Sequence, residues 1–143
     1  DETREIAMDT VELNREIPDA DNANIYSFVP FHGTPLRKVC QDKGLVKPDT
    51  IARALTDRPM LNMPQYPPNE INGLKKCFIL YVKLPKSKWK DIRKAEGTTP
   101  EAEKIYGELK AEFMEKYFVP PEDNPNAEFP ATADLEYGIA SPA

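Results

Sequence analysis

A single strand pattern stands among helical ones in this chain, and that imbalance limits the folds open to it. Residues 25–29 read Ile-Tyr-Ser-Phe-Val, a β-branched and aromatic run that Pro30 closes. A buried strand without neighbours would leave its backbone N–H and C=O groups unpaired, and buried groups of this kind are nearly always paired. We therefore expect the neighbours of this strand to come from elsewhere. The chain is then the C-terminal part of a longer protein, or an oligomer that completes its sheet between chains.

Helical patterns flank this strand on both sides. Residues 2–17 predict an amphipathic helix. The residues of its expected inward face recur at spacings of four, three and four: Ile6, Thr10, Leu13 and Ile17. Residues 18–24 predict a turn-rich link. After the strand, Thr34 as N-cap and Pro35 at the first helical position predict a short helix that Gly44 ends. The apolar face of this short helix is Leu36, Val39 and Cys40.

The second half of the chain is expected to be helical after a proline-rich connection. Residues 48–57 predict a short helix with Ile51 and Leu55 inward, and the four prolines of residues 58–68 predict an extended segment. A long helix is predicted over residues 69–84, and its wide apolar face indicates burial on two sides.

Two further helices are expected after residue 85. Residues 86–96 predict a basic helix with Trp89 and Ile92 inward, and Thr99-Pro100 begins the last helix. Residues 83–94 contain six Lys or Arg and one acidic residue, Asp91. We expect these cations to form a solvated helix face, attracted by an acidic tail, rather than a surface for an anionic partner or a lipid.

The net charge of −5 is located entirely in residues 119–143. Residues 1–118 contain all 19 Lys and Arg and 19 of the 24 Asp and Glu, so the body of the chain is neutral. A neutral body argues against nucleic acid as a partner. The longest apolar run, residues 78–82, is far shorter than the ~20 residues of a membrane-spanning helix.

Two cysteines, Cys40 and Cys77, lie in apolar helical patterns. A disulfide scaffold of this length would use more cysteines, and a structural metal site would pair them at close spacing. They are predicted to be buried thiols in a reducing compartment, which places the protein in the cytoplasm.

Residues 25–36, Ile-Tyr-Ser-Phe-Val-Pro-Phe-His-Gly-Thr-Pro-Leu, resemble the last βα portion of a radical S-adenosylmethionine enzyme, of the type often fused to a cobalamin-binding domain. In that family a turn ending in Glu-Thr opens a helix, as in residues 1–5, and the next strand ends in Pro-aromatic-x-Gly-Thr. Residues 61–64 and 80–83 resemble the C-terminal region of the same group, so the resemblance covers roughly residues 1–96.

The resemblance implies an α/β fragment that is mainly α in this chain. Residues 1–45 would be the end of a partial barrel of six β/α units (a partial TIM barrel), with 25–29 as its last strand. Residues 46–118 would be a helical C-terminal extension, and residues 119–143 an acidic, Pro-rich tail. Enzymes of this family cleave S-adenosylmethionine to a radical with a four-iron four-sulfur (4Fe-4S) cluster, and some members also use cobalamin.

The chain departs from the family in one decisive respect, because the three-cysteine loop C-x-x-x-C-x-x-C is absent. Cys40 and Cys77 match neither its number nor its spacing. The loop lies upstream in the family, so the parent protein would hold S-adenosylmethionine, the cluster and, in some members, cobalamin. The isolated chain is expected to bind no metal and to have no activity of its own. Its partners would be the upstream part of its own chain and a small-molecule or peptide substrate.

The resemblance also assigns candidate site residues. Phe28, Val29 and Pro30 match the strand end where the adenosine group lies, and Glu2 matches an acidic position of the preceding motif. His32, the only histidine, follows the strand and would contact substrate or move a proton. Each residue also has a purely structural interpretation: core for Phe28, a helix N-terminal charge for Glu2, and a loop position for His32.

Two functions follow from the sequence. The first is the C-terminal segment of a radical S-adenosylmethionine enzyme, which completes the barrel and shapes its substrate side. The alternative is a stand-alone helical binding or oligomerisation module without catalysis, which would use the wide apolar face of residues 69–84.

Overall fold

A computed structural model describes residues 2–17, 23 and 25–117 of the chain. The tail 119–143, Asp1 and most of the link 18–24 lie outside the described residues. Within them the chain is mainly helical and contains no β-strand. Its elements are α1 (Arg4–Arg15), α2 (Pro35–Asp42), α3 (Pro68–Lys83), the 3-10 helix η1 (Lys86–Lys88), α4 (Trp89–Ala95) and α5 (Pro100–Tyr117).

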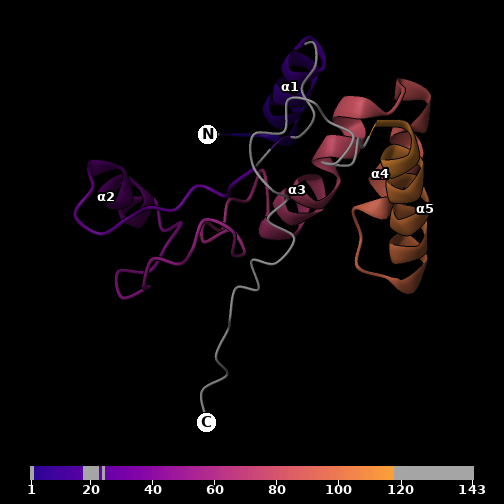
Figure 1. Cartoon of the computed structure of the whole chain (residues 1–143). Coiled ribbons are helices and arrows are strands. Elements are labelled where there is room, and N and C mark those ends of the chain that lie inside the picture. Colours follow the sequence, from indigo (N-terminus) through magenta and orange to yellow (C-terminus); the bar gives the residue numbers. More distant parts are fainter. Residues whose placement is uncertain (1, 18–22, 24, 118–143) are drawn as a thin grey trace, which may run out of the picture.

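Helix α3 is the centre of the main core. Helices α1, α4 and α5 pack around it, while α2 lies to one side at the end of an open stretch of chain (Figure 1). The core consists largely of α3 side chains, with Leu84 and Ile92 beyond them, and its buried α3 members include Leu74, Cys77, Phe78, Leu80 and Tyr81. The prediction that this helix is buried on more than one side is confirmed.

The inward face predicted for α1 is wrong. Ile6, Leu13 and Ile17 are 50%, 62% and 51% exposed, whereas Ala7 and Val11 are buried against α3. The helix is rotated so that Arg4 and Arg15, one at each end, share the side of Ala7 and Val11. The polar contacts of these two arginines therefore decide which face of α1 is buried.

Arg15 joins α1 to the C-terminus of α3. Its Nη1 donates to the carbonyl oxygens of Tyr81, Val82 and Leu84 at 2.6, 2.8 and 2.8 Å. The last carbonyls of a helix lack intrahelical donors and carry partial negative charge, so a guanidinium stabilises them. The Arg15 guanidinium also lies 5.8 Å from the centre of the Trp89 ring.

The predicted strand at residues 25–29 does not form among the described residues. Its side chains still alternate, with Ser27 and Val29 buried and Tyr26 and Phe28 exposed. One backbone bond ties it to another segment, from the Ser27 N–H to the Leu55 carbonyl at 3.2 Å. The pattern for a strand is present, but a strand needs a neighbour along its length, and the described chain supplies one at a single point.

The helix predicted over residues 48–57 is also absent. Turns replace it, and Ile51 and Leu55 are exposed rather than inward. The cause is Arg37, whose guanidinium takes the carbonyls of Pro48 and Thr50 as acceptors. In a helix these carbonyls would accept from the N–H groups four residues later.

Helix α2 begins and ends as predicted. The Thr34 side chain accepts from the Arg37 N–H at 3.3 Å, and Gly44 has a φ of 68° just after the helix. A positive φ of this kind favours glycine, which is why the helix stops there. The predicted apolar face is divided: Cys40 is buried with Val46 and Leu61, while Leu36 and Val39 are exposed.

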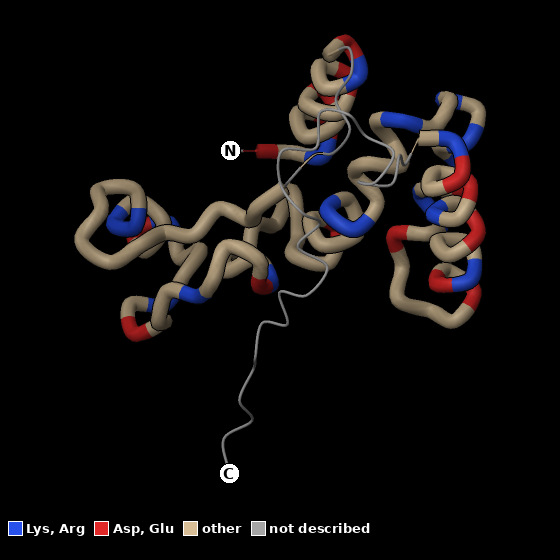
Figure 2. Tube along the Cα trace, in the orientation of Figure 1, with Lys and Arg blue, Asp and Glu red and all other residues tan. Residues whose placement is uncertain are grey.

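The cations of residues 83–94 contact carboxylates of the same body. Lys86 pairs with Glu12 at 2.5 Å, and Lys88 pairs with Glu112 at 3.0 Å. Lys94 pairs with Asp91 within α4. Figure 2 shows both signs of charge interspersed along α4 and α5. Partners for this basic stretch among the described residues therefore lie in α1, α4 and α5. The acidic tail, which the sequence also suggested as a partner, lies outside the described residues.

Gly73 allows α3 to approach the end of α4 closely. A Cβ added at Gly73 would lie 2.8 Å from Glu96 Cβ and 3.0 Å from the Glu96 carbonyl oxygen. Alanine usually stabilises a helix interior by about 1 kcal/mol over glycine, but overpacking costs about 1–3 kcal/mol. We expect Gly73→Ala to lower the free energy of unfolding by about 1–2 kcal/mol in urea titrations. Gly107→Ala on α5, where a Cβ meets nothing within 4 Å, should raise it. If both substitutions change the free energy of unfolding equally and in the same direction, close packing at Gly73 is not the reason for its effect.

Candidate functional site

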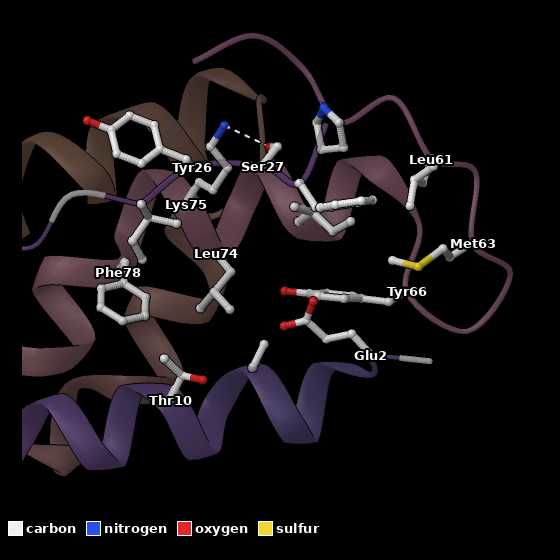
Figure 3. A pocket seen from close by; sticks show the side chains of 15 residues that line it. Glu2, Thr10, Tyr26, Ser27, Leu61, Met63, Tyr66, Leu74, Lys75 and Phe78 are labelled. Carbon is white, nitrogen blue, oxygen red and sulfur yellow. Dashed lines mark hydrogen bonds between the residues drawn. The ribbon is translucent and has the colours of Figure 1, made fainter. Parts of the chain in front are cut away.

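A cavity of about 140 Å³ lies between α1, α3 and the irregular segments 25–28 and 59–66 (Figure 3). Its wall is mainly apolar, because α3 turns Leu74 and Phe78 toward it and the proline-rich segment adds Leu61 and Met63. The prolines hold this segment out of regular structure, so it folds over the end of α3 instead of extending it.

The cavity brings together two of the five site residues predicted from the sequence. Glu2 and Phe28 both line it, although they are far apart in the chain. Val29 and Pro30 are buried but do not line it, and Phe28 is 48% exposed, so it is not a core residue. His32 lies at a separate open depression beside α2.

The polar groups of the cavity gather at opposite ends. Lys75 extends toward residues 25–28, where its ammonium donates to Ser27 Oγ at 2.9 Å and to the Asp57 carbonyl at 3.3 Å. Burial lowers the pKa of Lys75, and the charge of Asp57 opposes that shift. At the α1 end, Glu2 lies beside Tyr66 (Figure 3). Burial, foremost, raises the pKa of Tyr66 to about 12, so its hydroxyl stays protonated.

Lys75 and Tyr66 line the cavity but are not among the site residues predicted from the sequence. A signal for Lys75 was present, because it lies next to Leu74 and between Ile71 and Phe78 on the predicted apolar side of α3. A lysine among apolar residues packs its methylene groups against them and extends its ammonium to the edge of the apolar face. Tyr66 gave no comparable signal, because its segment has no periodicity.

A second polar cluster joins α1, α3 and α4 around the Glu96 side chain, which is 5% exposed. Glu96 accepts from Arg4 at 2.6 Å and from the Tyr81 hydroxyl at 2.6 Å, and Arg93 contacts both Glu96 and Glu70. Burial and the hydrogen bond to Glu96 raise the pKa of Tyr81. Two arginines and two glutamates balance in charge, so this cluster holds helices together and leaves no charge for a ligand.

The described residues do not fit an iron–sulfur cluster. Cys40 and Cys77 are buried in separate apolar clusters, and burial, foremost, raises the pKa of Cys77 to about 12, far from the thiolate that a metal requires. No group of three or more His, Cys, Asp or Glu in the described part of the chain could hold a metal ion.

The cavity is also too small for S-adenosylmethionine. Pockets for ligands of that size have volumes of about 300–1,000 Å³, and this one has about 140 Å³. The residues that line this cavity could therefore supply at most one wall of such a site.

No family model, curated protein or solved structure matches the chain. Among the described helices, none combines the length and apolar character needed to cross a membrane.

Proposed function

We propose that this chain is the C-terminal segment of a radical S-adenosylmethionine enzyme. Its role is structural and substrate-facing: it packs on the preceding barrel and closes one side of it. The radical chemistry, the cluster and any cobalamin belong to the upstream part of the same protein. In that setting residues 25–29 become the last strand of the sheet.

The observation that supports this proposal is the distribution of solvent-exposed apolar side chains along the chain. Ten of the twelve exposed large apolar residues among the described ones lie between residues 6 and 55, and only Met114 and Tyr117 lie beyond. Single exposed apolar residues are ordinary, but their concentration in one stretch of the chain is expected if that stretch packs against another part of the protein. Eight of these ten residues lie within residues 1–45, the part of the chain that resembles the barrel end.

Residues 25–29 support the same proposal. Tyr26 and Phe28 alternate with the buried Ser27 and Val29, which is how a strand places its side chains on two faces. A preceding barrel strand could bond to the backbone of this segment, and elements packed on the face of that sheet could cover Tyr26 and Phe28.

The alternative module has less support. It would use the wide apolar face of α3, and in this fold α1, α4 and α5 already bury that face. A partner could reach it only if one of these helices left the core.

The test compares the chain alone with the same chain joined to the upstream sequence of its reading frame. The proposal requires a C-x-x-x-C-x-x-C loop upstream, iron–sulfur absorbance in the longer protein and reductive cleavage of S-adenosylmethionine by it. It also expects amide hydrogen exchange at residues 25–29 to slow in the longer protein, because their N–H groups gain strand partners. An upstream sequence without the loop, or unchanged exchange at 25–29, would overturn it.

A further inference from the structure

The cavity between α1 and α3 has the size of a single small apolar group. An enclosed apolar protein cavity of about 150 Å³ is large enough to bind benzene, and this one, which is half-open to solvent, has about 140 Å³. Its apolar wall, with Leu74 and Phe78 on α3 and Leu61 and Met63 opposite, suits a ring or a branched chain rather than a polar molecule.

Lys75 supplies the second observation. An ammonium group has three N–H donors, and two of these are used by neutral oxygens, on Ser27 and Asp57. Among the described residues no carboxylate lies within ion-pair distance of Lys75. The Asp57 carboxylate acts on Lys75 through its charge but does not accept a hydrogen bond from it. A partly buried cation whose hydrogen-bond acceptors are neutral is stabilised by an anion that accepts from its third donor.

The two ends of the cavity differ in charge, which orients a ligand. Lys75 lies at the end formed by residues 25–28, and Glu2 lies at the α1 end beside Tyr66 (Figure 3). A carboxylate is therefore attracted to one end and repelled from the other.

We propose that this cavity binds a small monocyclic aromatic carboxylic acid, with the ring against Leu74 and Phe78 and the carboxylate on the Lys75 ammonium. The inference does not depend on the radical enzyme proposal, because all of its residues belong to this chain and its test uses the chain alone.

The experiment titrates the full chain at pH 7 with 3-phenylpropanoate and with 3-phenyl-1-propanol, an uncharged molecule of the same length, followed by protein NMR. We expect the acid to bind about five-fold more tightly, because a partly exposed ion pair contributes a factor of this size. Lys75→Met should remove this preference and leave the binding of the alcohol unchanged. Lys110→Met, an exposed lysine on α5, is the matched control and should change neither.

Filling the cavity tests the location of the ring. Leu74→Phe and, independently, Met63→Phe should weaken the binding of both molecules. Two variants on different segments separate occupation of the cavity from misfolding of either one, and far-ultraviolet circular dichroism checks that each retains its helices. The proposal is overturned if neither molecule binds to the wild-type chain or if the two bind equally. It is also overturned if the preference for the acid survives Lys75→Met, or if folded filled variants bind like the wild type.

Discussion

Glu96→Gln should lower the free energy of unfolding by about 2–3 kcal/mol, the larger of two strong effects expected in this fold. The substitution keeps the shape of the side chain but removes the charge that balances Arg4 and Arg93. Removing one partner of a fully buried ion pair costs about 3–5 kcal/mol, and the cost is lower here because the two arginine side chains are 23% and 46% exposed. Urea titrations of the full chain measure the difference.

Glu103→Gln is the matched control for this prediction. Glu103 pairs with Lys76 at 2.6 Å, the same distance that joins Glu96 to Arg4, but its side chain is 54% exposed. Exposed ion pairs contribute about 0–1 kcal/mol, so its loss should be small. If Glu96→Gln and Glu103→Gln lower the free energy of unfolding equally, burial of Glu96 is not what makes its ion pairs important.

Arg37→Met should destabilise the region around α2 by about 2 kcal/mol. Arg37 is 3% exposed and donates to the carbonyls of Pro30, Pro48 and Thr50 at 2.8, 3.1 and 2.6 Å. Methionine fills similar space but leaves these carbonyls without their charged donor, and bonds to charged groups contribute about 1.5–3 kcal/mol each before water replaces some of them. Amide hydrogen exchange in α2 should accelerate more than exchange in α3.

The neighbouring Lys38 provides the control for Arg37. It lies on the same helix and pairs with Asp42 at 2.8 Å, but its side chain is 75% exposed. Lys38→Met should change α2 exchange by little, since an exposed pair within one helix contributes about 0.3–0.5 kcal/mol. If Lys38→Met accelerates exchange as much as Arg37→Met, the carbonyl contacts of Arg37 are not what holds this region.

Local signals in the sequence predicted the helices whose ends carry capping residues or prolines. Thr34, Pro35 and Gly44 gave the bounds of α2, and Pro100 gave the start of α5. These signals act within a few residues, so they can be recognised without knowledge of the rest of the fold.

The errors arose where a distant polar side chain decided the outcome. Arg4 and Arg15 bind groups that lie 66–92 residues away, and they turn Ile6 and Leu13 of α1 outward against the apolar periodicity. Arg37 likewise takes the carbonyls that a helix at 48–57 would need. Apolar periodicity indicates which residues could share a helix face. It does not indicate which face becomes buried when a polar side chain binds a group far away in the sequence.

The candidate site was predicted only in part for the same reason. Glu2 and Phe28 were named separately, and their common cavity exists because residues 59–66 fold back over α3. Lys75 became visible as a site residue once Ser27 and Asp57 were placed beside it.

The anchoring of α1 on α3 has a consequence for synthesis on the ribosome. The carbonyls that hold Arg15 and the carboxylate that holds Arg4 belong to residues translated long after α1. At about 5–20 residues per second, the delay is on the order of several seconds. An isolated helix of 12 residues is only marginally stable in water. During that interval Ala7, Val11 and the apolar residues beside them remain accessible, and a chaperone or an earlier-translated domain can bind them before α3 does.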